Sequence, residues 1–248
     1  MFSRRLFKKA FLVFRQEGLA VLLVKSFRFI YSKVISRIGG LLYETNSRKY
    51  WDFRMRWDWG VVGGGWQTQL LAASLFANVP KEKFGDVSVV LDYGCATGDS
   101  SIILKIFLPN SSVMLHDFSR IGVEKGVAKY SRFLPVRVWN RVDKADLVYC
   151  SNVIEHVEDP GALVDELISA SSKFIVLQCP ENERHSDGSR LSQHSPAGEH
   201  VWTVDNEFFE EFIRDPRVRW EKFTGIVPMA WEGGVQAYYF GTLASSSA

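Results

Sequence analysis

The chain has 248 residues, of which 46% are apolar and 23% are charged. This length is enough to bury one substantial core, so we expect one main domain rather than several. The three cysteines, Cys95, Cys150 and Cys179, form no Cys-x-x-Cys pair, which argues against disulfides and a structural zinc site.

Charge is distributed unevenly along the chain. The formal net charge is +2, yet residues 1–41 hold nine basic residues against the single acid Glu17, a local charge of +8 that leaves −6 for the rest. A segment so different in charge predicts an N-terminal extension with a role of its own.

Residues 1–41 have the periodicity of two amphipathic helices, expected over residues 3–16 and 19–38, with apolar residues on one side and Lys and Arg on the other. Gly39 and Gly40 are expected to end the second helix. The longest uncharged run, residues 18–24, is far shorter than a membrane span, which needs about 20 residues. These helices predict peripheral contact with an anionic membrane surface. Packing on the rest of the chain or on a second copy, and nucleic-acid binding, are the alternatives.

The segment that follows is rich in aromatic residues. Residues 44–66 combine tryptophans with arginines and end in the three glycines 63–65, and a helix is expected over residues 67–78. This segment predicts a lid over a ligand site, and an aromatic helix packed on the main domain is the alternative.

A short apolar run, residues 87–91, leads into the turn 92–98, which contains Gly94 and Gly98, and a helix is expected from Ser100. Such a run predicts a strand buried on both faces. A strand that stops at a glycine turn and opens into a helix leaves backbone amides at the carboxyl edge of a sheet, so this turn predicts a cofactor site. A plain connection between strand and helix is the alternative.

Two further segments follow at informative spacing. A second strand is expected to end at Asp117, about 20 residues beyond the glycine turn, where a doubly wound sheet places a carboxylate for ribose hydroxyls. An N-cap for the next helix is the other interpretation of Asp117. A third apolar run, residues 145–150, continues into Glu155-His156-Val157.

Together these segments resemble the class I S-adenosylmethionine-dependent methyltransferases. The turn is similar to motif I, (Asp/Glu)-x-Gly-x-Gly-x-Gly, with Ala96 at the middle glycine, and residues 145–160 are similar to the fourth-strand region of that family. The resemblance implies an α/β fold, a Rossmann-like doubly wound seven-stranded sheet, here with an N-terminal helical extension. We expect a basic extension at 1–41, a lid and lead-in helix at 42–85 and the methyltransferase domain at 86–243.

The resemblance also implies S-adenosyl-L-methionine as the cofactor. Arg54 is expected near its methionine carboxylate, and Asn140 and Val142 lie in the loop where family members contact the adenine, with Asp143 as a substitute for the acid expected there. The expected cofactor-binding residues are Arg54, Asp92, Gly94, Cys95, Ala96, Gly98, Asp117, Phe118, Ser119, Asn140, Val142, Ser151 and Asn152.

The rest of the chain predicts the acceptor side of the site. Residues 181–202 form the longest irregular stretch and are expected to be the substrate-binding loop. His156 and His200 are the candidate catalytic bases, and a solvated or structural histidine is the alternative for each. A helix over 204–214 and two antiparallel edge strands over 217–226 and 237–243 are expected. No metal site is expected, because no His or acid pair has ligand spacing on one element.

The sequence therefore predicts methyl transfer to the hydroxyl of a small molecule, sugar or glycolipid, in the cytoplasm or at the inner face of the membrane. Residues 44–66 loosely resemble small methyltransferases that accompany bacterial surface-polysaccharide genes, which favours polysaccharide biosynthesis. A quinone- or lipid-directed methyltransferase and a non-catalytic cofactor-binding subunit of a glycan-assembly complex are the alternatives. Nucleic-acid substrates are disfavoured, because no Asn/Asp-Pro-Pro-aromatic run follows the fourth strand, and the oligomeric state is left open.

Overall fold

The structure is a computed structural model that describes residues 19–227 and 234–244. The chain divides into two compact units, Met1–Gly64 and Gly65–Ala248, which we describe separately. Of the helices within the described residues, none combines the length and the apolar character needed to cross a bilayer.

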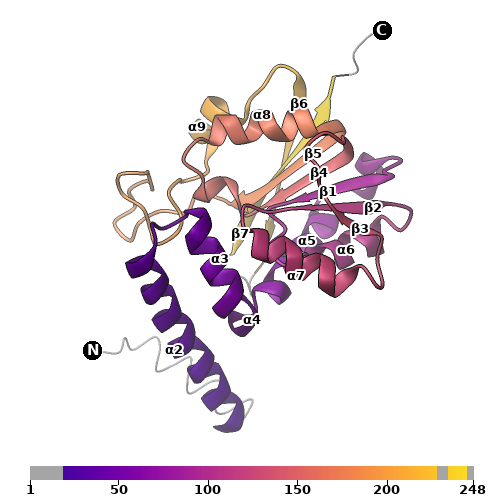
Figure 1. Cartoon of the computed structure of the whole chain (residues 1–248). Coiled ribbons are helices and arrows are strands. Elements are labelled where there is room, and N and C mark those ends of the chain that lie inside the picture. Colours follow the sequence, from indigo (N-terminus) through magenta and orange to yellow (C-terminus); the bar gives the residue numbers. More distant parts are fainter. Residues whose placement is uncertain (1–18, 228–233, 245–248) are drawn as a thin grey trace. The chain divides into compact units, whose positions relative to one another are not determined.

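The second unit is built on one seven-stranded mixed sheet (Figure 1). The strand order is β3-β2-β1-β4-β5-β7-β6, in which β7 runs antiparallel to both β5 and β6. The expected fold class is thereby confirmed, and so is the antiparallel pair at the end of the chain. The strands are β1 (Val89–Tyr93), β2 (Ser112–His116), β3 (Val136–Val138), β4 (Ala145–Ser151), β5 (Ser171–Pro180), β6 (Val218–Ile226) and β7 (Val235–Leu243).

Helices cover both faces of this sheet (Figure 1). On one face lie α5 (Gly64–Asn78), α6 (Ser100–Phe107) and α7 (Arg120–Tyr130), and on the other lies α8 (Pro160–Ala170). The short elements are the 3-10 helices η1 (Lys81–Phe84) and η2 (Ile154–His156), the helical turn α9 (Asn206–Phe208) and the π-helix η3 (Phe209–Ile213). Residues 139–144 between β3 and β4 contain no helix, as expected from their number.

Alternation along the strands forms apolar clusters on both faces of the sheet. On β4, Val148 belongs to the cluster that contains Leu163 and Leu167 of α8, whereas its neighbour Leu147 belongs to the cluster that contains Leu75 of α5. These residues are fully or almost fully buried. Because successive strand residues point to opposite faces, a parallel sheet covered on both sides needs a continuous apolar run, which the sequence supplies.

The first unit consists of three described helices, α2 (Leu19–Leu42), α3 (Arg48–Trp57) and α4 (Trp59–Val62). The expected end of α2 at Gly39 and Gly40 is wrong, because the helix continues through both glycines to Leu42. A Cβ at Gly39 would lie 3.1 Å from the ring of Phe53, so this glycine allows α2 to approach α3 closely. The helix expected over residues 3–16 lies outside the described residues.

A second difference lies before β6. The helix expected over 204–214 begins two residues later, because the side chain of Asp205 caps the amide of Phe208 at 3.1 Å. Its second half is a π-helix, in which the amide of Arg214 donates to the carbonyl of Phe209 at 2.9 Å. The apolar stripe is kept, since Phe208 and Ile213 are both buried.

Candidate functional site

Five parallel strands, β1 to β5, end at one edge of the sheet. In the register, Tyr93 of β1 is paired with His116 of β2 and with Cys150 of β4, and Leu115 of β2 is paired with Val138 of β3. The loops that follow these strands therefore leave the sheet together. In open α/β sheets this is the edge at which ligands bind.

The turn after β1 requires glycine at two positions. Gly94 has φ +75°, and a Cβ there would lie 2.2 Å from the side chain of Val153, so any larger residue would be excluded. Gly98 has φ +69°, and a Cβ there would lie 3.2 Å from Leu115. Ala96 is also left-handed, at φ +48°, a conformation that few non-glycine residues adopt. The turn is therefore a defined, tight conformation.

Backbone amides of this turn bond to the end of β2. The amides of Gly94 and Cys95 both donate to the carbonyl of His116, at 2.8 and 2.9 Å, and that of Ala96 donates to Asp117 Oδ2 at 2.7 Å. The second carboxylate oxygen, Oδ1, accepts from the amide of Ser119 at 2.7 Å. Asp117 is thus fixed by two amides at the end of β2, the position where a doubly wound sheet places a carboxylate for ribose hydroxyls.

Asp92 is a residue of β1 just before the turn. Its carboxylate is buried and accepts hydrogen bonds from the hydroxyls of Ser100 at 2.5 Å and Ser101 at 3.1 Å, so it joins the end of β1 to the start of α6. Burial raises the pKa of Asp92 to about 7, although the two serine hydroxyls favour the charged form and lower it. A direct contact of Asp92 with the cofactor stays a prediction.

The remaining expected residues differ in exposure. Ser119 is buried and caps α7, accepting from the amide of Gly122 at 3.2 Å, whereas the side chain of Phe118 beside it is 57% exposed. Cys95 is buried. Ser151 is the last residue of β4, and Asn152 follows it, with its amide donating to the carbonyl of Gln178 at 2.7 Å.

The loop after β3 is shaped by Asn140. Its side-chain oxygen accepts from the amides of Val142 and Asp143, and Val142 itself is 83% exposed, so its side chain is available for contact with a planar ring. Asp143 pairs with Arg137 at 2.6 Å, and hydrogen bonds from Arg137 and Asn140 lower its pKa. Asp143, the substitute for the acid expected near the adenine, is therefore already engaged in an ion pair with Arg137.

Arg54 lies in the first unit, on α3. Its guanidinium pairs with Asp58 at 2.5 Å and donates to the hydroxyl of Tyr50 at 3.0 Å. These contacts hold the side chain within its own unit. The expected role of Arg54 at the cofactor carboxylate stays a prediction.

Both candidate bases belong to one cluster. His156 ends η2, which follows β4, and its ring lies 4.7 Å from that of His200, measured between centroids. Nδ1 of His156 bonds the carbonyl of Glu199 at 2.9 Å, and Nδ1 of His200 bonds the carboxylate of Glu183. Burial lowers the pKa of His156. Burial also opposes protonation of His200, but the bond to Glu183 raises the pKa of that imidazole overall.

Three residues at this edge were not expected to matter. Glu155 is buried beside His156, and Glu183 orients His200. Asp99 accepts from Lys129 and Tyr130, both at 2.6 Å, and so joins the turn to the end of α7. The Glu-His pair was visible in the sequence, but no local pattern marks Glu183 or Lys129 as neighbours of residues so distant in the chain.

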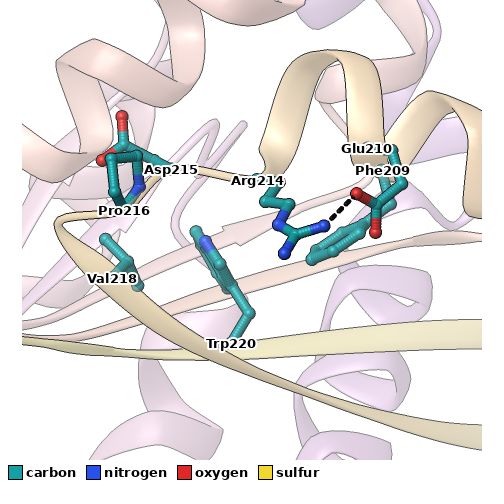
Figure 2. Close-up of a pocket in the computed structure, with 7 residues that line it drawn as sticks. All are labelled: Phe209, Glu210, Arg214, Asp215, Pro216, Val218 and Trp220. Atoms are coloured by element: carbon teal, nitrogen blue, oxygen red, sulfur yellow. Dashed lines mark hydrogen bonds and ion pairs between the residues drawn. The ribbon is translucent and has the colours of Figure 1, made fainter.

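A separate pocket lies between η3 and the start of β6 (Figure 2). It has a volume of about 660 Å³ and is lined by residues that include Phe209, Arg214, Val218 and Trp220. Val218 begins β6 and is paired with Leu243, at the edge opposite to the loops described above. None of its lining residues follows the carboxyl end of a parallel strand, so we do not assign the reaction to it.

The buried carboxylate of Asp92 gives the first test. Because its folded-state pKa of about 7 exceeds the unfolded value of about 3.9, the folded state gains a proton relative to the unfolded state between these values, and stability falls as pH rises through that window. Asp92→Asn cannot titrate, so its stability relative to the parent should increase by about 1–4 kcal/mol between pH 4 and pH 8. Urea unfolding across this range measures the difference.

Asp146→Asn is the control for this measurement. Burial tends to raise the pKa of Asp146, but the amide of Ser88 and the ammonium of Lys173 lower it overall. The stability that this carboxylate contributes is therefore present above pH 4 and is lost at lower pH. Parallel stability profiles for Asp92→Asn and the parent chain would contradict the expectation.

Comparisons with known proteins agree with this geometry. A family model described as a methyltransferase domain matches residues 66–215. Trans-aconitate 2-methyltransferase of Methylobacterium radiotolerans is 26% identical over 117 residues, which cover 45% of this chain and only 44% of that relative.

Solved structures show the same fold. An O-methyltransferase family protein from Burkholderia thailandensis is similar with a TM-score of 0.55 and 11% identity, covering 92% of this chain and 72% of that one. Magnesium protoporphyrin IX methyltransferase from Synechocystis PCC 6803, with bound S-adenosylhomocysteine, is similar with a TM-score of 0.50 and 15% identity, covering 74% and 85%.

The resemblance inferred from the motifs is thereby confirmed. The tight glycine turn and the fixed carboxylate of Asp117 lie together at the edge of the sheet where ligands bind, so the residues present fit a bound nucleoside. Since the family model covers more than half of its length, the chain belongs to the methyltransferase domain family, in the class I group whose cofactor is S-adenosylmethionine.

Proposed function

We propose that this chain transfers the methyl group of S-adenosylmethionine to the hydroxyl of a small-molecule, sugar or glycolipid acceptor. One observation supports this most directly. A carboxylate fixed by two amides, Asp117, and a pair of imidazoles, His156 and His200, stand on loops that leave the same edge of one sheet. The first suits a ribose and the second suits a hydroxyl that must lose its proton.

The donor half uses Asp117 and the loop after β3. Asp117, held in place by the amides of Ala96 and Ser119, would accept hydrogen bonds from the ribose hydroxyls. The exposed Val142 would contact the adenine. When bound, S-adenosylmethionine supplies a methyl group activated by its sulfonium. The protein therefore has mainly to align acceptor and donor, and to accept a proton.

The acceptor half uses the imidazole pair. His156 lies on η2 directly after β4, and His200 lies in the long loop after β5, so both approach from segments that can border an acceptor. Either imidazole would accept the hydroxyl proton while the oxygen attacks the methyl carbon. A small acceptor is also supported by the relative named for trans-aconitate, a small organic acid. The association with polysaccharide biosynthesis stays a prediction.

The described helix of the basic extension supports membrane contact as part of this function. Leu23, Phe27, Ile30 and Val34 of α2 recur at helical spacing and are between 49% and 65% exposed. Three cationic residues, Lys25, Arg28 and Lys33, lie outside this stripe and are exposed. This arrangement suits the surface of an anionic bilayer, and it also favours quinones or lipids as a second class of acceptor.

Donor binding is tested at Asp117. Asp117→Asn removes the negative charge and replaces one acceptor oxygen with a donor, while the side chain keeps its shape. Its affinity for S-adenosylhomocysteine in titration calorimetry should therefore fall by about 10- to 100-fold. Glu124→Gln, which changes an exposed carboxylate on α7, is the control and should bind as the parent does. Unchanged affinity in Asp117→Asn would remove this carboxylate from the donor site.

Methyl transfer is tested with labelled donor and fractions of lipid and sugar extracts. His156→Ala or His200→Ala should slow transfer to a hydroxyl acceptor by about 100-fold or more, because the proton loses its acceptor. The exposed His194 of the same loop supplies the control variant, His194→Ala. Unchanged turnover in both cluster variants would exclude the base role. Donor binding without transfer to any fraction would favour the non-catalytic alternative.

Membrane contact is tested with vesicles that contain phosphatidylserine. Each cation near such a surface contributes about 1 kcal/mol, so Lys25→Glu with Arg28→Glu should weaken binding of the full chain by at least about 30-fold. The same charge changes at Lys125 and Arg132, outside the extension, provide the control. Equal binding of the parent and of a version that begins at Leu42 would rule out a membrane role for the extension.

A further inference from the structure

We propose that Glu155, His156 and His200 form a binding site for one divalent transition-metal ion of the Zn²⁺ type. Each residue offers one donor atom, and the three donor atoms lie within 4.8 Å of one another. Two of the residues come from η2 and the third from the loop after β5. No spacing rule in the sequence would have brought them together, and the proposal departs from the expectation of no metal site.

The carboxylate of Glu155 is the first reason. Its side chain is 1% exposed, and neither carboxylate oxygen has a hydrogen-bond partner among the described residues. Nε2 of His156 lies 3.9 Å from Oε1 of Glu155, which is too far for a hydrogen bond. A buried carboxylate without a partner is costly, and a cation between it and the imidazoles would offset that cost.

The orientation of the imidazoles is the second reason. Nδ1 of His156 is directed at the carbonyl of Glu199, and Nδ1 of His200 is directed at the carboxylate of Glu183. Histidines that bind metals commonly donate one ring N–H to a carbonyl or a carboxylate, which fixes the ring and leaves the other nitrogen for the ion. Both imidazoles here have this arrangement, with Nε2 as the coordinating atom.

The donor set selects the ion. Two imidazoles and one carboxylate are a set that zinc binds in sites that keep an open position for water or substrate. Mg²⁺ and Ca²⁺ prefer oxygen ligands throughout, so they fit this cluster less well. The cysteines Cys150 and Cys179 are buried in the apolar cluster on the α8 face of the sheet and take no part in the donor set.

A metal here would strengthen an existing connection. The amide of Val201 already donates to the carbonyl of Glu155 at 2.8 Å, and Trp202 Nε1 donates to the carbonyl of Val157 at 2.8 Å. The ion would add ligand bonds between the same two segments and hold the acceptor loop against η2. Ligation and proton acceptance use the same nitrogen lone pairs, so histidines that hold the ion are not at that moment free bases.

The test is titration of the full chain with Zn²⁺ alone, after chelator treatment, by calorimetry, together with the absorption spectrum of Co²⁺ in its place. We expect one equivalent to bind. Glu155→Gln and His200→Asn should weaken binding by about 100-fold or more, and Glu183→Gln by about 10-fold or more, because it removes the carboxylate behind His200. Glu158→Gln changes a nearby exposed carboxylate and is the control, so its affinity for Zn²⁺ should equal that of the parent chain.

The outcomes separate this proposal from the methyl-transfer function. Metal binding is read without donor or acceptor, so failure of methyl transfer leaves it intact. Absence of stoichiometric binding to the parent chain overturns the proposal, as does equal affinity in Glu155→Gln and Glu158→Gln. Because Glu155 is buried, urea unfolding of its variant is measured as well. Should that variant unfold, the Glu183→Gln comparison and the Co²⁺ spectrum decide.

Discussion

Two neighbouring acceptors at the end of β2 hold the site together. The carbonyl of His116 takes the amides of Gly94 and Cys95, and the carboxylate of Asp117 takes the amides of Ala96 and Ser119. The turn after β1 and the start of α7 are therefore fixed to one strand end. The proposed donor half depends on this connection, because these hydrogen bonds stabilise a turn that contains three left-handed residues.

The same connection changes what the turn offers to a ligand. A glycine turn before a helix is expected to present free amides, but four amides here donate within the protein, with that of Gly98 bonded to the carbonyl of Cys95. In the proposed donor site, the turn would therefore contribute its shape, and Asp117 would contribute the hydrogen-bond acceptor. The carboxylates of Asp92 and Asp99 support the turn through hydrogen bonds, Asp92 to α6 and Asp99 to α7. Buried acids are retained where such bonds satisfy them.

Much of the fold could be predicted because its signals are local. The strand over 136–138 was expected and is observed, and the glycine turn follows its strand as the motif requires. Tertiary contacts account for the failures. Gly39 carries the local signal of a helix end, yet the contact with Phe53 makes it part of a helix interface. His200 lies beside His156 only because the loop after β5 turns back over η2, which no periodicity encodes.

The donor and acceptor halves of the proposed site therefore differ in how they are held together. The donor half is made of loops that directly follow adjacent strands, so the register of the sheet fixes their geometry. The acceptor half joins η2 to a long irregular loop through a few hydrogen bonds, such as that from Val201 to Glu155. Local opening costs less free energy where such contacts are few, so in the proposed site the loop would adjust to an acceptor more readily than the donor half. In the proposed acceptor half, two imidazoles and the carboxylates of Glu155 and Glu183 lie close together, so their charges would bear directly on any acceptor that binds there.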